Sequence, residues 1–169
     1  MKTLLTICLT GMTFLCFAQL ETLPYFDISV SGINHESSPE DLFYILGTPD
    51  TVFDPQYECG FYSVDLQDIE SVMLHRYPDL DFLVVDGEVV FRDVYFNEAT
   101  NHVLKTSEFK LSHETSLEEL EELFPQAFEH WKTENSSVLR LQPCEFCDDE
   151  IWLHMKDDHI WRVQFWDPC

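Results

Sequence analysis

The sequence predicts an α+β fold of two tandem halves, in each of which a short helix packs on an antiparallel sheet. The prediction depends first on a repeated order of elements. A capped amphipathic helix precedes three strand-like runs, and an acidic turn joins the last two runs. The spacing repeats as well, because the helix caps Ser38 and Ser116 lie 78 residues apart and the turns at Asp86 and Asp157 lie 71 residues apart. This repetition indicates a duplicated α-β-β-β unit.

Both helices carry signals at their ends. Ser38 can cap the first helix, and Pro39 suits the first helical position, where no amide hydrogen is needed. The second helix begins with Ser116 and Glu119, which match a capping box, and Pro125 is predicted to end it. Helices this short are marginal alone, so we expect each to be held by a sheet.

Each half is predicted to end in a hairpin. In the first half, Phe82–Val85 and Val89–Phe96 flank Asp86-Gly87, a pair typical of a two-residue turn. In the second half, we expect a three-residue turn at residues 157–159, which would place Lys156 opposite Ile160.

The last hairpin alternates with a period of two residues, which predicts one buried and one open face. With Trp161, Val163 and Phe165 turned to the core, four residues share the opposite face as a candidate partner-binding surface: Trp152, His154, Ile160 and Trp166. Aromatic side chains on a stiff sheet are typical of protein-binding hot spots. The alternative is that the other half or a loop covers this face.

The chain is divided by these signals into three parts. Residues 1–18 have one early charge and then an apolar run too short for a comfortable membrane span, which predicts a signal peptide cleaved near Ala18. An uncleaved anchor is the alternative. Residues 19–100 form the first helix-on-sheet half, and residues 101–169 form the second. We therefore expect an extracytoplasmic protein, periplasmic or secreted, with no membrane span in the mature chain.

Acidic residues dominate the charge. The chain has 32 Asp and Glu against 9 Lys and Arg, a formal net charge of −23 that becomes −24 when Lys2 is removed with residues 1–18. This excludes sequence-independent binding of nucleic acid, which needs basic side chains to replace phosphate counterions. A protein partner with a basic surface would be attracted by the same charge.

Four cysteines remain after residue 18, and an oxidising compartment favours disulfides over zinc. Extending the predicted register of the last hairpin brings Cys147 opposite Cys169 and leaves Cys59 for Cys144. The rival arrangement closes the tight loop from Cys144 to Cys147 and leaves Cys59 for Cys169.

The first helix and the residues after it carry a resemblance. The segment SSPEDLFYILGTPD contains a Ser cap, a helix and then Leu46-Gly47-Thr48-Pro49. Together with tandem halves of this size, it resembles the fold shared by the β-lactamase inhibitory protein and the small lipoprotein of the outer-membrane β-barrel assembly machine. The second half departs from this pattern with Leu123-Phe124-Pro125. The resemblance implies a secreted binding module and no functional residue.

The sequence favours a non-catalytic protein-binding module, of inhibitor or assembly-accessory type, with no cofactor and no metal site. It contains no Gly-x-Ser-x-Gly, phosphate-binding loop or His-Glu-x-x-His motif. The alternative is a thiol-redox enzyme that uses Cys144 and Cys147, or a metal-dependent enzyme that uses His154 and His159. Surface positions on a hairpin and its turn are the better explanation of the two histidines.

Overall fold

The computed structural model describes residues 21–57, 62–63, 68–69 and 71–168. The predicted signal peptide, Cys59 and Cys169 lie outside the described residues. Within the described part of the chain, no helix is long and apolar enough to cross a membrane.

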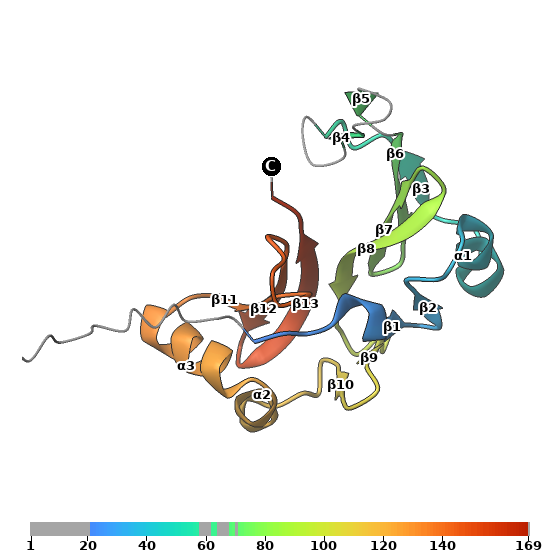
Figure 1. The fold of residues 1–169 in the computed structure, drawn as a ribbon. Helices are drawn as coiled ribbons and strands as arrows, with labels where there is room; N and C mark the ends of the chain where they lie inside the picture. The colour runs from blue at the N-terminus through green and yellow to red at the C-terminus, as the bar shows by residue number, and fades with distance from the viewer. Residues whose placement is uncertain (1–20, 58–61, 64–67, 70, 169) are drawn as a thin grey trace, which may run out of the picture.

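A seven-stranded antiparallel sheet organises the molecule (Figure 1), and it runs in the order β11-β12-β13-β8-β7-β6-β3. Its strands are β3 (Thr51–Phe53), β6 (Val72–Tyr77), β7 (Leu80–Val85), β8 (Glu88–Tyr95), β11 (Val138–Leu141), β12 (Glu150–Lys156) and β13 (His159–Trp166). Strands β8 and β13 are the last strands of the two predicted repeats, and they pair with each other antiparallel. The two sets of strands therefore form one continuous sheet.

The described residues form three α-helices, α1 (Pro39–Leu46), α2 (Leu117–Leu123) and α3 (Pro125–Glu134), and capping boxes start the first two. Ser38 and Ser116 each accept a hydrogen bond from the third helical amide, and the acidic side chain at that position accepts one from the backbone amide of the cap residue. Helix α3 was not predicted. Pro125 ends α2, but it also stands at the start of α3, where its missing amide hydrogen costs nothing.

A smaller four-stranded sheet has the order β10-β9-β1-β2. Its strands are β1 (Ser29–Val30), β2 (Ile33–Asn34), β9 (Leu104–Lys105) and β10 (Lys110–Leu111). A 3-10 helix (η1, Tyr25–Asp27) precedes it, and β4 (Tyr62–Ser63) pairs with β5 (Asp68–Ile69) apart from both sheets. The fold is α+β.

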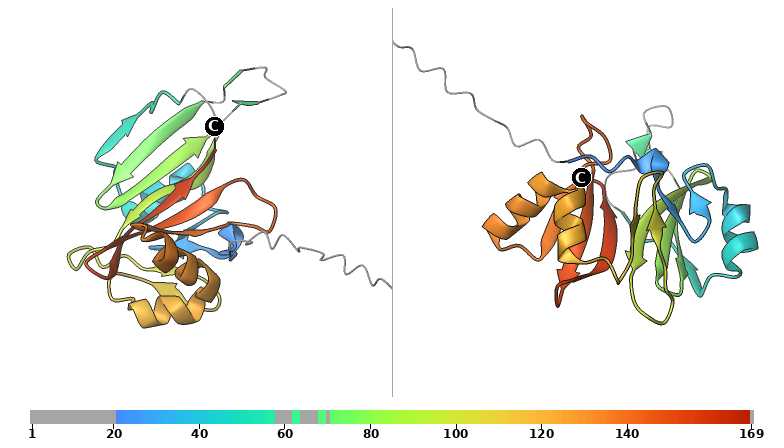
Figure 2. Two further views of the ribbon diagram at one scale, coloured as in Figure 1. Left: turned by 90° about the vertical axis from the view of Figure 1, so that its left-hand side faces the viewer. Right: turned by 90° about the horizontal axis from the view of Figure 1, so that it is seen from below.

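The main core lies on one face of the large sheet, here called the inner face. Leu153, Val163 and Phe82 of this face pack in one cluster with Phe128 of α3 and Leu104 of the small sheet, and all five are at most 1% exposed. Helices α2 and α3 and the small sheet thus lie on the same side of the large sheet (Figure 2). The opposite side, here called the outer face, carries no helix among the described residues.

The turn of the last hairpin differs from the prediction. Asp157 and Asp158 have φ values of 50° and 63°, so they form a two-residue turn, and Lys156 pairs with His159 rather than with Ile160. Aspartate tolerates the left-handed region better than most residues, which allows this turn. A bulge then shifts the register between His154 and Met155.

The bulge restores the predicted register over the rest of the hairpin. Met155 pairs with Ile160 and His154 pairs with Arg162, so Trp161 is the extra residue. Beyond it, the predicted partners stay opposite one another as far as Glu150 and Trp166. A bulge changes which face the neighbouring side chains occupy.

Candidate functional site

Five ring-bearing side chains form a continuous row on the outer face, here called the aromatic row: Tyr95, Trp161, His154, Trp152 and Trp166. Trp152 and Trp166 stack with ring centroids 5.3 Å apart and planes 10° apart. The other neighbouring centroids are 5.9 to 6.2 Å apart. The row therefore crosses strands β8, β13 and β12.

Period-two alternation places most of the aromatic row on one face. Trp152 and His154 are two residues apart on β12, and Trp166 pairs with Glu150 at the end of β13. Trp161 reaches the row through the bulge, and its exposed fraction is 38%. The other four members are half-buried, and the ring of each contacts a neighbouring ring of the row.

Hydrogen bonds fix the orientation of two rings in the row. The Trp152 Nε1 donates to Glu150, which also accepts a two-point contact from Arg140. The Nε2 of His154 lies 3.0 Å from Oε1 of Gln164. Burial lowers the pKa of His154, so its ring is neutral at pH 7. The row is thus a stiff surface whose rings need little ordering when a partner binds.

Two buried aspartates lie beside the aromatic row at the centre of the sheet. Asp81 and Asp93 are paired across β7 and β8 and are 3% and 6% exposed. Arg76 makes a two-point contact with Asp81, and Arg162 binds Asp93 with Nε 2.7 Å from Oδ1. Burial is the main cause that raises the pKa of Asp93, while Arg162 opposes it.

The guanidinium of Arg162 also connects the aspartates to the row. Its carbon lies 5.6 Å from the centroid of the Tyr95 ring, within cation–π range. At its Tyr95 end, the aromatic row therefore adjoins the ion pair of Arg162 and Asp93.

The outer face of the first half is different. Val72, Leu74, Leu83 and Val85 form a second buried cluster there, against which Tyr57 and Val90 pack. Leu83 is fully buried. This part of the outer face is a small core.

The predicted surface residues are divided between the two faces. Trp152, His154 and Trp166 lie on the outer face, but Ile160 is 1% exposed and belongs to the core, which corrects the prediction. Trp161 was predicted to be buried and is exposed, because the two-residue turn and the bulge exchange the faces of these two residues. Tyr95 was missed. For Ile160 and Trp161, the available signal was Asp157-Asp158 before them, since two consecutive aspartates suit a two-residue turn.

The cysteine pairing predicted first is wrong. Cys144 and Cys147 form a disulfide with their Cα atoms 5.3 Å apart, so Cys147 is not paired with Cys169, nor Cys144 with Cys59. The amide of Cys147 also donates to the carbonyl of Cys144, which closes a tight turn between β11 and β12. The chain therefore leaves the ladder at Glu150, and the extrapolated register does not apply beyond it.

The two histidines of the enzyme alternative are not brought together. His154 pairs with Arg162 in mid-strand, while His159 pairs with Lys156 beside the turn. The described residues contain no group of three or more His, Cys, Asp or Glu placed to hold a metal ion.

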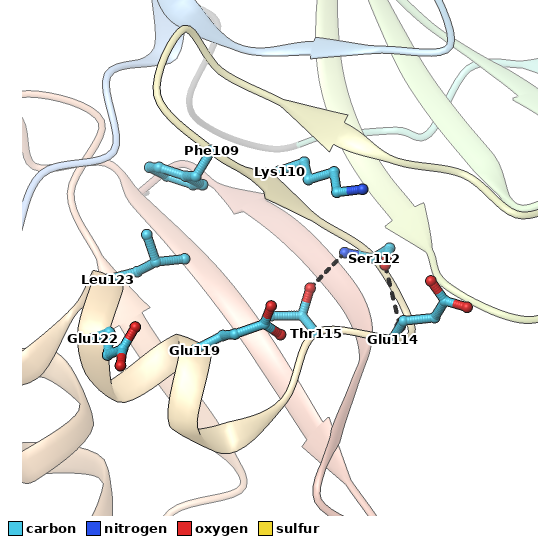
Figure 3. A pocket seen from close by; sticks show the side chains of 8 residues that line it. All are labelled: Phe109, Lys110, Ser112, Glu114, Thr115, Glu119, Glu122 and Leu123. Carbon is cyan, nitrogen blue, oxygen red and sulfur yellow. Dashed lines mark hydrogen bonds between the residues drawn. The ribbon is translucent and has the colours of Figure 1, made fainter.

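A separate hollow of about 400 Å³ lies beside α2 (Figure 3). Glu119 and Glu122 of the helix and Glu114 before it make its lining acidic. Its polar groups already serve local structure, because Ser112 accepts from the Glu114 amide and Glu119 closes the capping box with Ser116. The hollow carries no further sign of a ligand.

Comparisons with known proteins give no relative for this chain. No family model, no curated protein and no solved structure matches it.

Proposed function

We propose that this chain is a non-catalytic, exported module that binds another protein through the aromatic row. The single observation that supports this most is the row itself, which presents three tryptophans on a sheet face that no described helix covers. Tryptophan and tyrosine dominate protein-binding hot spots because they bury much area with few rotatable bonds.

The charge of the chain supports a basic partner. With a formal net charge of −23, the molecule attracts positively charged surfaces and repels acidic ones. The Cys144–Cys147 disulfide is typical of an oxidising compartment and supports export. An inhibitor or an assembly accessory would both fit a rigid surface of this kind.

Affinity capture with matched variants tests the proposal. The immobilised chain is exposed to the extracellular and envelope proteins of its source, beside a variant with Trp152→Ser and Trp161→Ser. The control variant, Phe43→Ser with Tyr44→Ser, removes two rings on α1 that are 61% and 89% exposed. We expect a protein that the original chain and the control retain and the row variant does not. Equal retention by all three would contradict the proposal.

A thiol-disulfide function is the second candidate, because Cys144 and Cys147 do form a disulfide and Cys144 is exposed. Their turn is followed by Asp148, Asp149 and Glu150, whose charge disfavours a thiolate. Thiol titration after mild reduction distinguishes the candidates, since a redox role requires a thiol whose pKa lies below about 7.5.

A further inference from the structure

A second hollow lies where three distant segments meet. Helix η1, the disulfide turn between β11 and β12, and the end of β13 together enclose a cavity of about 290 Å³. It lies at the Trp166 end of the aromatic row, and Trp166 is the one member of the row in its lining. Its volume is near the lower limit of small-ligand sites, enough for a group the size of one long side chain.

The walls of this cavity are mainly aromatic. The rings of Tyr25, Phe26, Phe165 and Trp166 contribute to its lining, together with the Cys144–Cys147 disulfide. Tyr25 is held in place because its hydroxyl accepts from the Phe91 amide at 3.2 Å, and its ring meets that of Phe165 at 5.9 Å. Burial raises the pKa of Tyr25 to about 12, so the hydroxyl stays neutral. Phe26 is 75% exposed and forms the rim.

Two carboxylates also line the cavity. Asp149 has no hydrogen-bond or ion-pair partner in the part of the chain that the structure describes. Asp167 is only weakly paired with Arg92, because Nη1 of Arg92 lies 4.0 Å from Oδ2 of Asp167. The same Nη1 donates a hydrogen bond to the Phe165 carbonyl at 2.9 Å. A third carboxylate in the lining, Glu150, is already neutralised by Arg140.

The charge of Asp149 acts on Asp167. Burial is the main cause that raises the pKa of Asp167, and the charge of Asp149 raises it further. Burial also raises the pKa of Asp149, and the charge of the neighbouring Asp148 raises it further. The two carboxylates lie among apolar side chains without a close basic partner, so a positively charged group in the cavity would stabilise them.

We propose that this cavity binds an organic cation, an ammonium or guanidinium group on an apolar stem. The rings pack against the stem and attract the cation through their faces, and Asp149 and Asp167 supply the opposite charge. The same chemistry is available from a free amine or from a lysine or arginine side chain of another protein.

Titration of the purified chain with n-pentylamine tests the site without any protein partner. Binding is followed by calorimetry and by the indole N–H resonance of Trp166, with 1-pentanol and hexanoate as neutral and anionic analogues. We expect n-pentylamine to bind at least about tenfold more tightly than 1-pentanol, and hexanoate not to bind. Equal affinity for the amine and the alcohol would overturn the proposal.

Single carboxylate variants locate the charge. Asp149→Asn and Asp167→Asn should each weaken amine binding by about fivefold, as expected for a partly solvated ion pair. Asp148→Asn is the matched control, because Asp148 is adjacent in sequence and exposed but does not line the cavity. An equal loss in all three variants would show only a general effect of net charge and would overturn the proposal.

A blocked lysine distinguishes the two sources of the cation. Nα-acetyl-lysine N-methylamide carries the ammonium group as it occurs within a protein chain. If it binds with the same dependence on Asp149 and Asp167, the cavity accepts a side chain of a partner. If n-pentylamine alone binds with that dependence, the cavity is a site for free amines. Trp166 is the one member of the aromatic row that lines this cavity, while Trp152 and Trp161, which the capture experiment replaces, do not line it. The titration and the capture experiment can therefore fail separately.

Discussion

The outer face of the large sheet is used differently in its two halves. On β6 and β7, it carries a small core in which Leu83 is fully buried. On β12 and β13, the same face carries the aromatic row, with Trp161 38% exposed. The strands pair antiparallel in both halves, so the direction of pairing does not determine the difference.

The comparison shows how one sheet can serve two purposes. Apolar aliphatic residues fill the outer face on β6 and β7, where Tyr57 packs on them, and rings with polar edges fill it on β12 and β13. Between the two regions, Asp81 and Asp93 place charge at the centre of the face, each with its own arginine. The charged boundary separates the structural part of the face from the part proposed to bind.

The largest effect is expected from the buried cluster of the first half. Leu83→Ala should lower the free energy of unfolding by about 3 kcal/mol, because it leaves a cavity in a fully buried position. Urea unfolding measures this change. A loss below about 1 kcal/mol would mean that the outer face of the first half is also an open surface.

The boundary between the halves should be the next most sensitive position. Arg162→Met leaves Asp93 buried without its partner, at a cost of about 2 to 3 kcal/mol at pH 7. The pKa of Asp93 is already raised by burial, so the folded state takes up a proton more readily than the unfolded chain. The cost should therefore shrink as the pH falls through that raised pKa toward the ordinary value of 3.8.

Unfolding at pH 7 and pH 5 measures the change, with Arg140→Met as the control because Arg140 binds Glu150 on the exposed edge. A penalty in Arg162→Met that is independent of pH would contradict the account of Asp93.

The two helix caps compare the halves directly. Ser38→Ala and Ser116→Ala each remove one side of a capping box and should cost about 1 kcal/mol. Thermal unfolding of both variants measures the two caps under the same conditions. Because α2 buries its face against the main core as α1 does through Leu42, we expect similar values. A cost confined to one variant would show that one helix is dispensable.

The smallest effect on stability is expected in the aromatic row. Trp161→Ser should change the free energy of unfolding by less than about 1 kcal/mol, because the side chain of the bulged residue is exposed. Chemical denaturation of the single variant provides the measurement. A loss of several kcal/mol would place Trp161 in the core.

Much of the fold could be predicted from local signals in the sequence. The caps at Ser38 and Ser116 start helices where expected, and the turn at Asp86-Gly87 joins β7 and β8. These features depend on few neighbouring residues. The four-stranded sheet was not predicted, because its strands are two residues long and pair across the chain, as Ser29 does with Lys105.

The candidate site was predicted only in part. The faces of Ile160 and Trp161 depend on one residue of turn length, and a shift of one residue exchanges every side chain between faces. The predicted pairing of Cys147 with Cys169 failed for a related reason. The paired register of β12 and β13 ends at Glu150 and Trp166, and Cys147 lies outside it, in the turn that the Cys144–Cys147 disulfide closes. The cavity beside Trp166 requires three segments that lie far apart in the sequence, so no local pattern indicates it.

The most direct test of the central claim is the dissociation constant of the captured partner for two matched variants. The row variant replaces Trp152 and Trp161 with Ser, and the control replaces Phe43 and Tyr44, which are exposed on α1. Circular dichroism first confirms that both variants fold. If the aromatic row is the binding surface, the row variant should bind about 100-fold more weakly or worse, and the control should stay within about threefold of the original chain. Equal affinities of the two variants would contradict the claim.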